Sequence, residues 1–342
     1  MKYKKIIIGV LLGVSALSIT GAFYKELSLD NLNLRLTDIS GSRSALTDTI
    51  EGVVSKSIGK GSTIKINKDE IILSDLRNVD DEFLLTKEDI NKNKEFYKKM
   101  KGYNRSGVIE NKGEKIFTRI KNNNIYIYKD IDDKVHEIII PFEEKERNLV
   151  NKSEVTIIEL LKSNNGIVYG ILTFINISGD YNSNLIEIDI SKKNYKTYNV
   201  KDASSNFYAM TDKNELYVSR GNELLKYDYK AGKYNSIIKF DRSIRFNKGY
   251  FYFSNPAESG QLRTISAINL ESGKIIECGY ANNEILDIAI KGNKVYKIYT
   301  ALEHTYDKMN YIIEVLSLDD KSILYKGDLE LNKKFGFNLD IK

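Results

Sequence analysis

The sequence predicts an all-β fold of six four-stranded units, or seven as the alternative, preceded by an N-terminal membrane-anchor or signal helix. Three observations support this prediction: a recurring hairpin pattern, a second strand-turn-strand motif, and a composition suited to a large core. The 342 residues are 42% hydrophobic, enough for one large domain or two ordinary ones. Charged residues make up 29% with a formal net charge of only +5, which excludes a disordered chain and argues against a nucleic acid partner.

The first repeated pattern is a polar turn followed by alternating apolar residues, which is typical of a β-hairpin. It is clearest at 67–74, 212–219 and 247–254, and looser at 122–127, 164–170 and 291–297. One position of each copy is apolar or aromatic and serves as an anchor: Ile72, Tyr126, Tyr169, Tyr217, Tyr252 and Tyr296. Consecutive anchors lie 35 to 54 residues apart, an interval that holds four short strands with their turns.

A second motif, again strand, turn and strand, follows the later anchors. Its copies lie at 186–195, 225–234, 266–275 and 314–323. Asp, Asn or Ser stands where the first strand ends and Lys, Gly or Asp fills the turn, because these residues favour turn geometry. One more apolar strand precedes most anchors, at 115–120, 155–160, 207–210, 243–246 and 285–290. Each unit therefore supplies about four strands.

These units resemble the β-propeller superfamily over residues 50–342. The sequence contains no Trp-Asp blade ending, no paired glycines of the kelch type and no Asp-box, so the resemblance is to an architecture and not to one family. It implies blades packed radially, with the strand before each anchor lining a central channel. The recurring tyrosine anchors are expected to pack between blades.

The anchors indicate six blades. A propeller has to join its first and last blades, so we expect residues 335–341 to be the closing strand in a sheet begun near the other terminus. A seventh blade built from 28–60 plus that strand is the alternative. The propeller is assigned to 51–342, with 26–50 as a linker or the start of the closing blade.

The N-terminus predicts export. Lys2, Lys4 and Lys5 precede an uncharged, mainly apolar run, residues 6–22, which is long enough for a short membrane span. The side chains expected in the membrane include Ile6, Leu11, Leu12 and Leu17. The basic flank should stay in the cytoplasm, giving a single-pass protein of the cell membrane with its C-terminal domain outside. Cleavage of residues 1–25 as a signal peptide, giving a secreted protein, is the alternative.

Interruptions of the repeat are the places to search for function, since the repeat itself supplies the scaffold. Thr86, with Asp89 three residues later, is typical of a helix N-terminus and predicts a helical insertion near 86–101. This helix would cover the channel mouth, bind a partner, or only cover a blade edge.

Three connections, 176–184, 255–260 and 300–310, are longer than a hairpin needs. If the blades align as proposed, all three emerge on one face of the propeller and form a polar rim that contains tyrosines. The candidate binding residues on this rim are Tyr181, Asn182, Glu258, His304 and Tyr306. A solvated rim without a ligand is the alternative.

The sequence offers little for catalysis. One cysteine, Cys278, excludes an intramolecular disulfide, and two distant histidines exclude a His- or Cys-rich metal centre. No nucleophile or phosphate-loop motif is complete, so no catalytic residue, metal or cofactor is predicted. The charged residues expected around the channel are Asp287 and Glu159, with Arg119 and Arg245 as neighbours.

Two functions compete. The first is a membrane-associated propeller outside the cytoplasm that binds a protein or glycan of the cell envelope as an assembly module. The second is an envelope enzyme that cleaves glycan or peptide through Asp287 and Glu159 at the channel mouth. The first is favoured because the sequence lacks a catalytic constellation.

Overall fold

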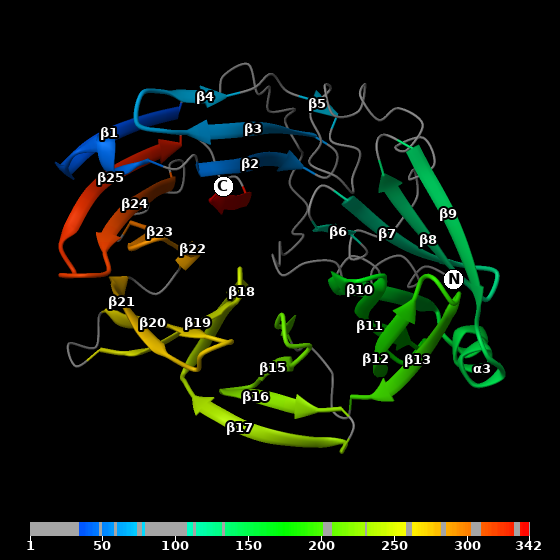
Figure 1. Ribbon diagram of the computed structural model, residues 1–342. Helices are drawn as coiled ribbons and strands as arrows, with labels where there is room; N and C mark the ends of the chain where they lie inside the picture. Colours follow the sequence, from blue (N-terminus) through cyan, green and yellow to red (C-terminus); the bar gives the residue numbers. More distant parts are fainter. Residues whose placement is uncertain are drawn as a thin grey trace. The chain divides into compact units, whose positions relative to one another are not determined.

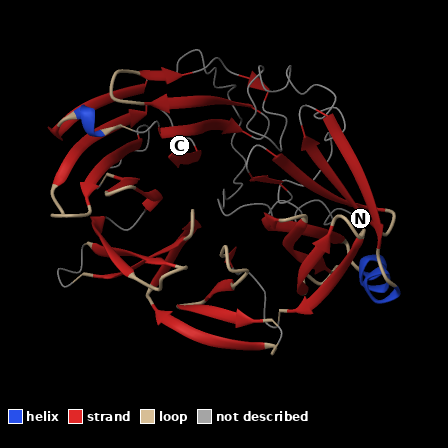
Figure 2. Cartoon of the chain, in the orientation of Figure 1, coloured by secondary structure: helices blue, strands red, loops and turns tan. Residues whose placement is uncertain are grey.

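The computed structural model describes residues 34–47, 50–57, 60–73, 77–78, 108–111, 114–131, 134–200, 207–229, 231–257, 262–281, 285–301, 309–331 and 336–341. They belong to one folded unit, residues 33–342. The described strands form six antiparallel sheets (Figure 1, Figure 2). This confirms the all-β class and the four-stranded unit that the sequence predicts.

Four of the sheets follow chain order from one edge to the other. They are β6 (Val108–Asn111), β7 (Glu114–Lys121), β8 (Asn124–Ile131) and β9 (Lys134–Pro141); β10 (Val155–Asn164), β11 (Ile167–Ile175), β12 (Tyr181–Asp189) and β13 (Asn194–Asn199); β14 (Phe207–Met210), β15 (Leu216–Arg220), β16 (Glu223–Asp228) and β17 (Lys233–Lys239); and β18 (Arg242–Asn247), β19 (Tyr250–Pro256), β20 (Arg263–Asn269) and β21 (Ile275–Ala281).

The other two sheets combine strands from both ends of the folded unit. One joins β22 (Ile285–Lys291), β23 (Lys294–Thr300), β24 (Met309–Ser317) and β25 (Ile323–Leu331) to β1 (Leu34–Gly41). The other joins β26 (Gly336–Ile341) to β2 (Ile50–Ser57), β3 (Lys60–Ile66) and β4 (Ile71–Leu73), while β5 (Arg77–Asn78) pairs with β3.

The hairpins form because their turns contain residues that tolerate a positive φ. Asn122 and Asn123 between β7 and β8 have φ of 51° and 57°, and Asn165 and Gly166 between β10 and β11 have 49° and 77°. Two consecutive positive values are typical of the two-residue turn whose twist matches that of paired strands. These are the turns that the sequence pattern identified.

The first strands of successive sheets contact one another. β10 contacts β6 and β14, β14 contacts β18, and β22 contacts β26. Each sheet therefore directs one edge strand toward a common centre, and its other strands lie progressively farther out (Figure 1).

From β6–β9 to β22–β25, successive sheets also cover one another's faces through buried clusters. Consecutive strand residues point to opposite faces, so Ile186 belongs to a buried cluster shared with the β6–β9 sheet while Leu185 packs against the β14–β17 sheet. A central strand that is covered on both faces reads as a continuous apolar run, as residues 185 and 186 do.

The anchor tyrosines pack between sheets, as predicted. The Tyr217 hydroxyl donates to the carbonyl of Leu270 in the next sheet (3.0 Å). The Tyr252 hydroxyl accepts from the backbone N–H of Ile290 (2.8 Å). Both rings are buried. At these two anchors the tyrosine therefore forms a hydrogen bond between neighbouring sheets.

The two chain ends are exchanged between neighbouring sheets. β26 pairs with β2 over six residue pairs, from Ile50 opposite Ile341 to Ser55 opposite Gly336, so the C-terminal strand closes a sheet begun near the N-terminus, as predicted. β1 instead pairs with β25 and becomes the fifth strand of the β22–β25 sheet. Residues 34–41 and β26 thus lie in different sheets, which corrects the alternative of one blade built from 28–60 and the closing strand.

In two sheets the predicted anchor of the hairpin repeat does not lie on the second strand. Ile72 lies on β4, and Tyr126 lies on β8, the third strand of its sheet, whereas the later anchors lie on second strands. Residues 115–120 consequently lie on β7, and the innermost strand of that sheet is β6. The physical reason is that successive hairpins of one sheet share the same turn chemistry and period of two, so a hairpin can be matched to its neighbour.

The described part of the chain includes one α-helix, α3 (Glu144–Lys152), between β9 and β10, which the sequence analysis did not predict. No helix in the described ranges has the length and apolar content needed to cross a bilayer. The predicted anchor at 1–25, with Ile6, Leu11, Leu12 and Leu17, lies outside the described residues, as does the predicted helix at 86–101.

Candidate functional site

One end of the sheets carries the long connections. Each second strand runs antiparallel to the first, so all turns from second to third strands emerge at the same end. Sheets also follow one another at this end: only Phe240 and Asp241 separate the last residue of β17 from the first of β18. We call this end the loop face. Residues 176–180, Ala257 and Leu262 lie on it, in agreement with the predicted common face, while 258–261 and 302–308 lie outside the described residues.

Two of the predicted rim residues lie on the loop face. Tyr181 and Asn182 are exposed at the start of β12. Glu258, His304 and Tyr306 fall outside the described residues.

Exposed apolar side chains, Tyr181 among them, occur at the loop-face ends of two successive sheets. Val155, Ile175 and Tyr181 stand opposite one another in register across β10, β11 and β12. Ile177 follows in the adjoining turn and is 81% exposed, and Phe207, the first residue of β14, is 51% exposed. We call Val155, Ile177, Tyr181 and Phe207 the apolar rim.

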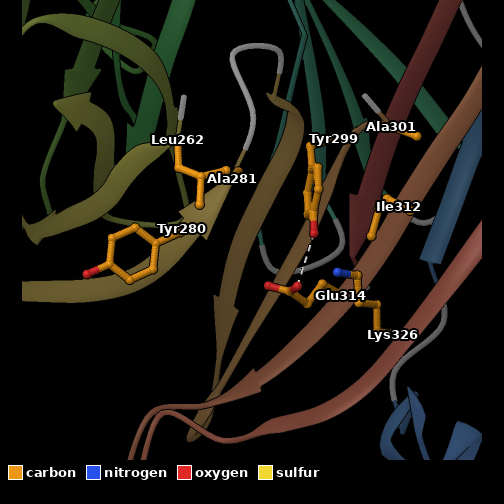
Figure 3. A pocket seen from close by; sticks show the side chains of 8 residues that line it. All are labelled: Leu262, Tyr280, Ala281, Tyr299, Ala301, Ile312, Glu314 and Lys326. Atoms are coloured by element: carbon orange, nitrogen blue, oxygen red, sulfur yellow. Dashed lines mark hydrogen bonds between the residues drawn. The ribbon is translucent and has the colours of Figure 1, made fainter. Parts of the chain in front are cut away.

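A pocket of about 390 Å³ lies between the β18–β21 and β22–β25 sheets (Figure 3). Its apolar lining consists of Leu262, Ala281, Ala301 and Ile312, and its polar lining of Tyr280, Tyr299, Glu314 and Lys326. The first three apolar residues stand at strand ends on the loop face, so the pocket belongs to the same end of the sheets as the apolar rim.

The wall of the pocket is built on a row of charged residues. Lys297 on β23, Glu314 on β24 and Lys326 on β25 are consecutive partners in the strand register. Lys297 Nζ lies 2.6 Å from Glu314 Oε1 and donates to the carbonyl of Tyr280 at 2.8 Å. The Tyr299 hydroxyl donates to Glu314 Oε2 at 3.0 Å (Figure 3).

Burial dominates the electrostatics of this wall. It lowers the pKa of Lys297, although the Glu314 carboxylate opposes the shift. It raises the pKa of Tyr299, and Glu314 adds to that effect. Burial also raises the pKa of the Cys278 thiol to about 12, so this residue stays neutral and unreactive at physiological pH. Both oxygens of Glu314 are engaged, which suits a fixed binding wall better than proton transfer.

The predicted channel residues are only partly brought together. Asp287 on β22 is 3% exposed, forms an ion pair with Arg245 on β18, and accepts from the backbone N–H of Ile288 at 2.8 Å. Glu159 lies on β10, and the β14–β17 and β18–β21 sheets stand between its sheet and that of Asp287 in chain order. Arg119 lies on β7, a second strand, which corrects its assignment to the innermost strand.

The side chain of Glu159 is exposed to solvent but has many protein atoms nearby. Its surface is exposed, yet nearby protein atoms raise the pKa of its carboxyl through burial. A side chain that faces a narrow wet space between protein walls has both properties.

The sequence matches no protein-family model, and a search of curated proteins finds no match. Among solved structures, an oligogalacturonate lyase in complex with manganese matches 85% of this chain and 83% of its own, with 8% identity and a TM-score of 0.47. The β-propeller domain of the Trilobed protease from Pyrococcus furiosus matches 51% of this chain and 57% of its own, with 12% identity and a TM-score of 0.36.

The acylaminoacyl peptidase of Pyrococcus horikoshii matches 52% of this chain, with 12% identity and a TM-score of 0.38, and the match spans only 33% of the peptidase. The six described sheets and the contacts between their inner strands have the arrangement of a β-propeller. This chain is a β-propeller. At such identities the comparisons concern the fold alone, and the activities named for these enzymes do not extend to the present propeller.

Sequence reasoning missed the polar wall of the propeller's pocket. A signal was available, because Lys297 and Glu314 interrupt apolar runs at positions whose alternation predicts burial. Their mutual register depends on where the β23–β24 hairpin begins, which the sequence does not specify. No group of three His, Cys, Asp or Glu side chains able to hold a metal ion occurs within the described ranges.

Proposed function

We propose that this chain is a six-bladed propeller held at the cell membrane by residues 1–25, and that its loop face binds a protein partner outside the cytoplasm. The observation that carries the proposal is the apolar rim. Its four members, Val155, Ile177, Tyr181 and Phe207, are 38% to 81% exposed and belong to the loop-face ends of two successive sheets.

The distribution of exposed apolar residues supports a binding role for the rim. The other exposed large apolar residues of the described ranges lie on edge or outer strands: Ile39, Ile139, Ile237, Ile275, Tyr280 and Ile323. Single exposed apolar residues are ordinary, whereas a group at one place marks an interaction surface. Tyrosine and phenylalanine are also enriched where protein partners make their strongest contacts.

Hydrolysis by the channel carboxylates has weaker support. A glycosidase of the common kind needs two carboxyl groups flanking one bond. Asp287 is held by Arg245 and by the Ile288 N–H, and its sheet is not adjacent to that of Glu159. Binding therefore accounts for the described side chains better than catalysis does.

A photocrosslinking experiment tests the protein partner. A benzophenone amino acid replaces Ile177 in the full chain, expressed in the cells that make it, and replaces Ile275 in a control variant. Both positions are exposed, at 81% and 53%, but Ile275 is on the outer strand β21. We expect one protein to be crosslinked from position 177 and not from 275. Carbohydrate adducts alone, or the same products from both positions, would reject a protein partner at this rim.

Membrane attachment has its own test. The Lys-rich start and the apolar run at 6–22 support an uncleaved anchor. The full chain should stay in membranes after carbonate washing, and a variant lacking residues 1–25 should not be exported. A mature chain that begins after residue 22 would instead establish a cleaved signal.

A further inference from the structure

The charges along the pocket wall do not cancel. Lys297 and Glu314 neutralise each other, and Lys326, the next residue in the cross-strand row, adds a second ammonium. Asp328 lies two residues farther along β25 but does not line the pocket, and its Oδ1 is buried. The cross-strand row of Lys297, Glu314 and Lys326 therefore carries one surplus positive charge.

The geometry leaves Lys326 as the group that meets a ligand. Each oxygen of Glu314 already accepts a hydrogen bond or ion pair, one from Lys297 and one from Tyr299. Lys297 is 1% exposed and has no access to the pocket interior. Lys326 is only half-buried and lines the pocket.

Stability alone does not explain the buried pair. Replacing a buried ion pair with apolar residues of similar volume is often neutral or stabilising. The buried cluster between the β6–β9 and β10–β13 sheets of the same propeller is built from apolar side chains such as Ile127 and Val168. The β18–β21 and β22–β25 sheets also share an apolar cluster, which includes Val295 and Ile312. The Lys297–Glu314 pair interrupts this cluster beside the pocket, and the interruption points to a ligand.

The remaining lining indicates the body of that ligand. Leu262, Ala281, Ala301 and Ile312 present apolar surface, and the Tyr280 ring is 52% exposed. A volume of about 390 Å³ falls within the range of small-molecule sites. A purely inorganic anion would leave these apolar groups without contacts.

We propose that this pocket binds a small organic monoanion, a carboxylate attached to an apolar or aromatic body. The carboxylate meets the ammonium of Lys326, and the body packs against Ile312 and Ala301. The Lys297–Glu314 pair holds the wall in place. This site is separate from the apolar rim and does not depend on the partner proposed for it.

Calorimetric titration of the detergent-solubilised full chain tests the ligand class. The probes are benzoate and its neutral isostere benzamide. We expect benzoate to bind about tenfold more tightly, which corresponds to about 1.4 kcal/mol, and to weaken as salt is raised. Equal affinities for the two probes would overturn the proposal. So would a titration with benzoate that does not saturate at about 20 mM, because the dissociation constant would then lie well above the millimolar range.

Variants locate the binding. Lys326→Met should weaken benzoate binding about tenfold, the loss of one charge pair, while Lys274→Met, an exposed lysine in the β20–β21 turn, should leave it unchanged. Ala301→Phe should block the pocket without any change in charge, which keeps the test decisive if Lys326→Met misfolds. Unchanged binding in the folded Ala301→Phe variant would place benzoate elsewhere and reject this pocket.

Discussion

The β10–β13 and β22–β25 sheets follow the same four-stranded plan but differ in how they are held. The first is contiguous in sequence and covers the β6–β9 sheet through an apolar cluster. The second receives β1 from the far end of the folded unit, and its face toward the β18–β21 sheet adds the Lys297–Glu314 pair and the pocket to an apolar cluster of its own. The difference teaches that the repeat specifies sheet geometry, while the chemistry between sheets varies independently.

Removing the closing strand should have the largest effect on this comparison. Deletion of 336–342 removes all six residue pairs that β26 makes with β2 and its contacts with β22, so one edge of the β22–β25 region loses its support. We expect loss of cooperative thermal unfolding by circular dichroism.

Limited proteolysis of the same deletion should sharpen the result. Cleavage should begin near β2 and β22 and spare the β10–β13 sheet, since that sheet lacks strands from the chain ends. A control lacking 1–25 should melt like the full chain. An unaltered, cooperative melt of the 336–342 deletion would show that closure contributes little to the fold.

Breaking the buried ion pair comes next in size. Lys297→Met leaves the Glu314 carboxylate buried with Tyr299 as its remaining donor, which should cost about 3–5 kcal/mol of unfolding free energy. Lys162→Met in the other sheet removes a bond to the Thr211 carbonyl (2.7 Å) and an ion pair with the exposed Asp212, and should cost about 1 kcal/mol or less.

Urea denaturation measures the loss of unfolding free energy in each of the two variants and so compares the two sheets. Adding Glu314→Leu to Lys297→Met should recover most of the loss, because no charge is then left buried. Equal costs for Lys297→Met and Lys162→Met would remove the proposed contrast between a lysine paired with a buried carboxylate and one paired with an exposed carboxylate.

The fold could be predicted from the sequence because its signals are local. Turns such as Asn165-Gly166 fix hairpins within a few residues, and the tyrosine anchors repeat once per unit. Which strand becomes innermost is not local, since it depends on packing against the next sheet, and for this reason Arg119 was misplaced.

The candidate site was harder to predict than the fold. The polar wall exists because Lys297, Glu314 and Lys326 meet across three strands, and a register slip of one residue would send Glu314 to the opposite face. The loop face could be predicted, because strand order alone determines which end carries the second-to-third connections. The pairing of β1 with β25 joins residues that are far apart in sequence, and no local pattern indicates it.

A smaller effect should distinguish two anchor tyrosines, Tyr252 on β19, which bonds to the β22–β25 sheet, and Tyr169 in the β10–β13 sheet. Tyr252→Phe leaves the buried N–H of Ile290 without its acceptor and should cost about 1–2 kcal/mol. Tyr169→Phe in β11 should be close to neutral, because no inter-sheet hydrogen bond of that hydroxyl occurs among the described residues. Chemical denaturation measures both, and a larger cost for Tyr169→Phe would reverse the expected order.

The smallest effect concerns the charge of Glu159, whose side chain is exposed to solvent, whereas that of Lys297 is buried. Burial raises the pKa of Glu159 above its ordinary value of 4.5, so the folded state keeps this proton to higher pH than the unfolded state does. Stability is therefore lost as pH rises from the ordinary value through the raised one, and Glu159→Gln should remove that loss. Because solvent screens the exposed carboxylate, we expect the Gln variant to gain only a few tenths of a kcal/mol at pH 7 and nothing at about pH 3.

Asp180, in the turn between β11 and β12, supplies a control of opposite sign. Hydrogen bonds from Ser178 and Asn176 lower the pKa of its carboxyl, so the stability that they contribute is present above the ordinary value of 3.8 and is lost as pH falls through the lowered one. Asp180→Asn should thus lower stability at pH 7, where Glu159→Gln raises it. Urea midpoints of both variants across pH 3 to 7 test the pair. Parallel pH profiles would mean that Glu159 does not face a wet space between protein walls.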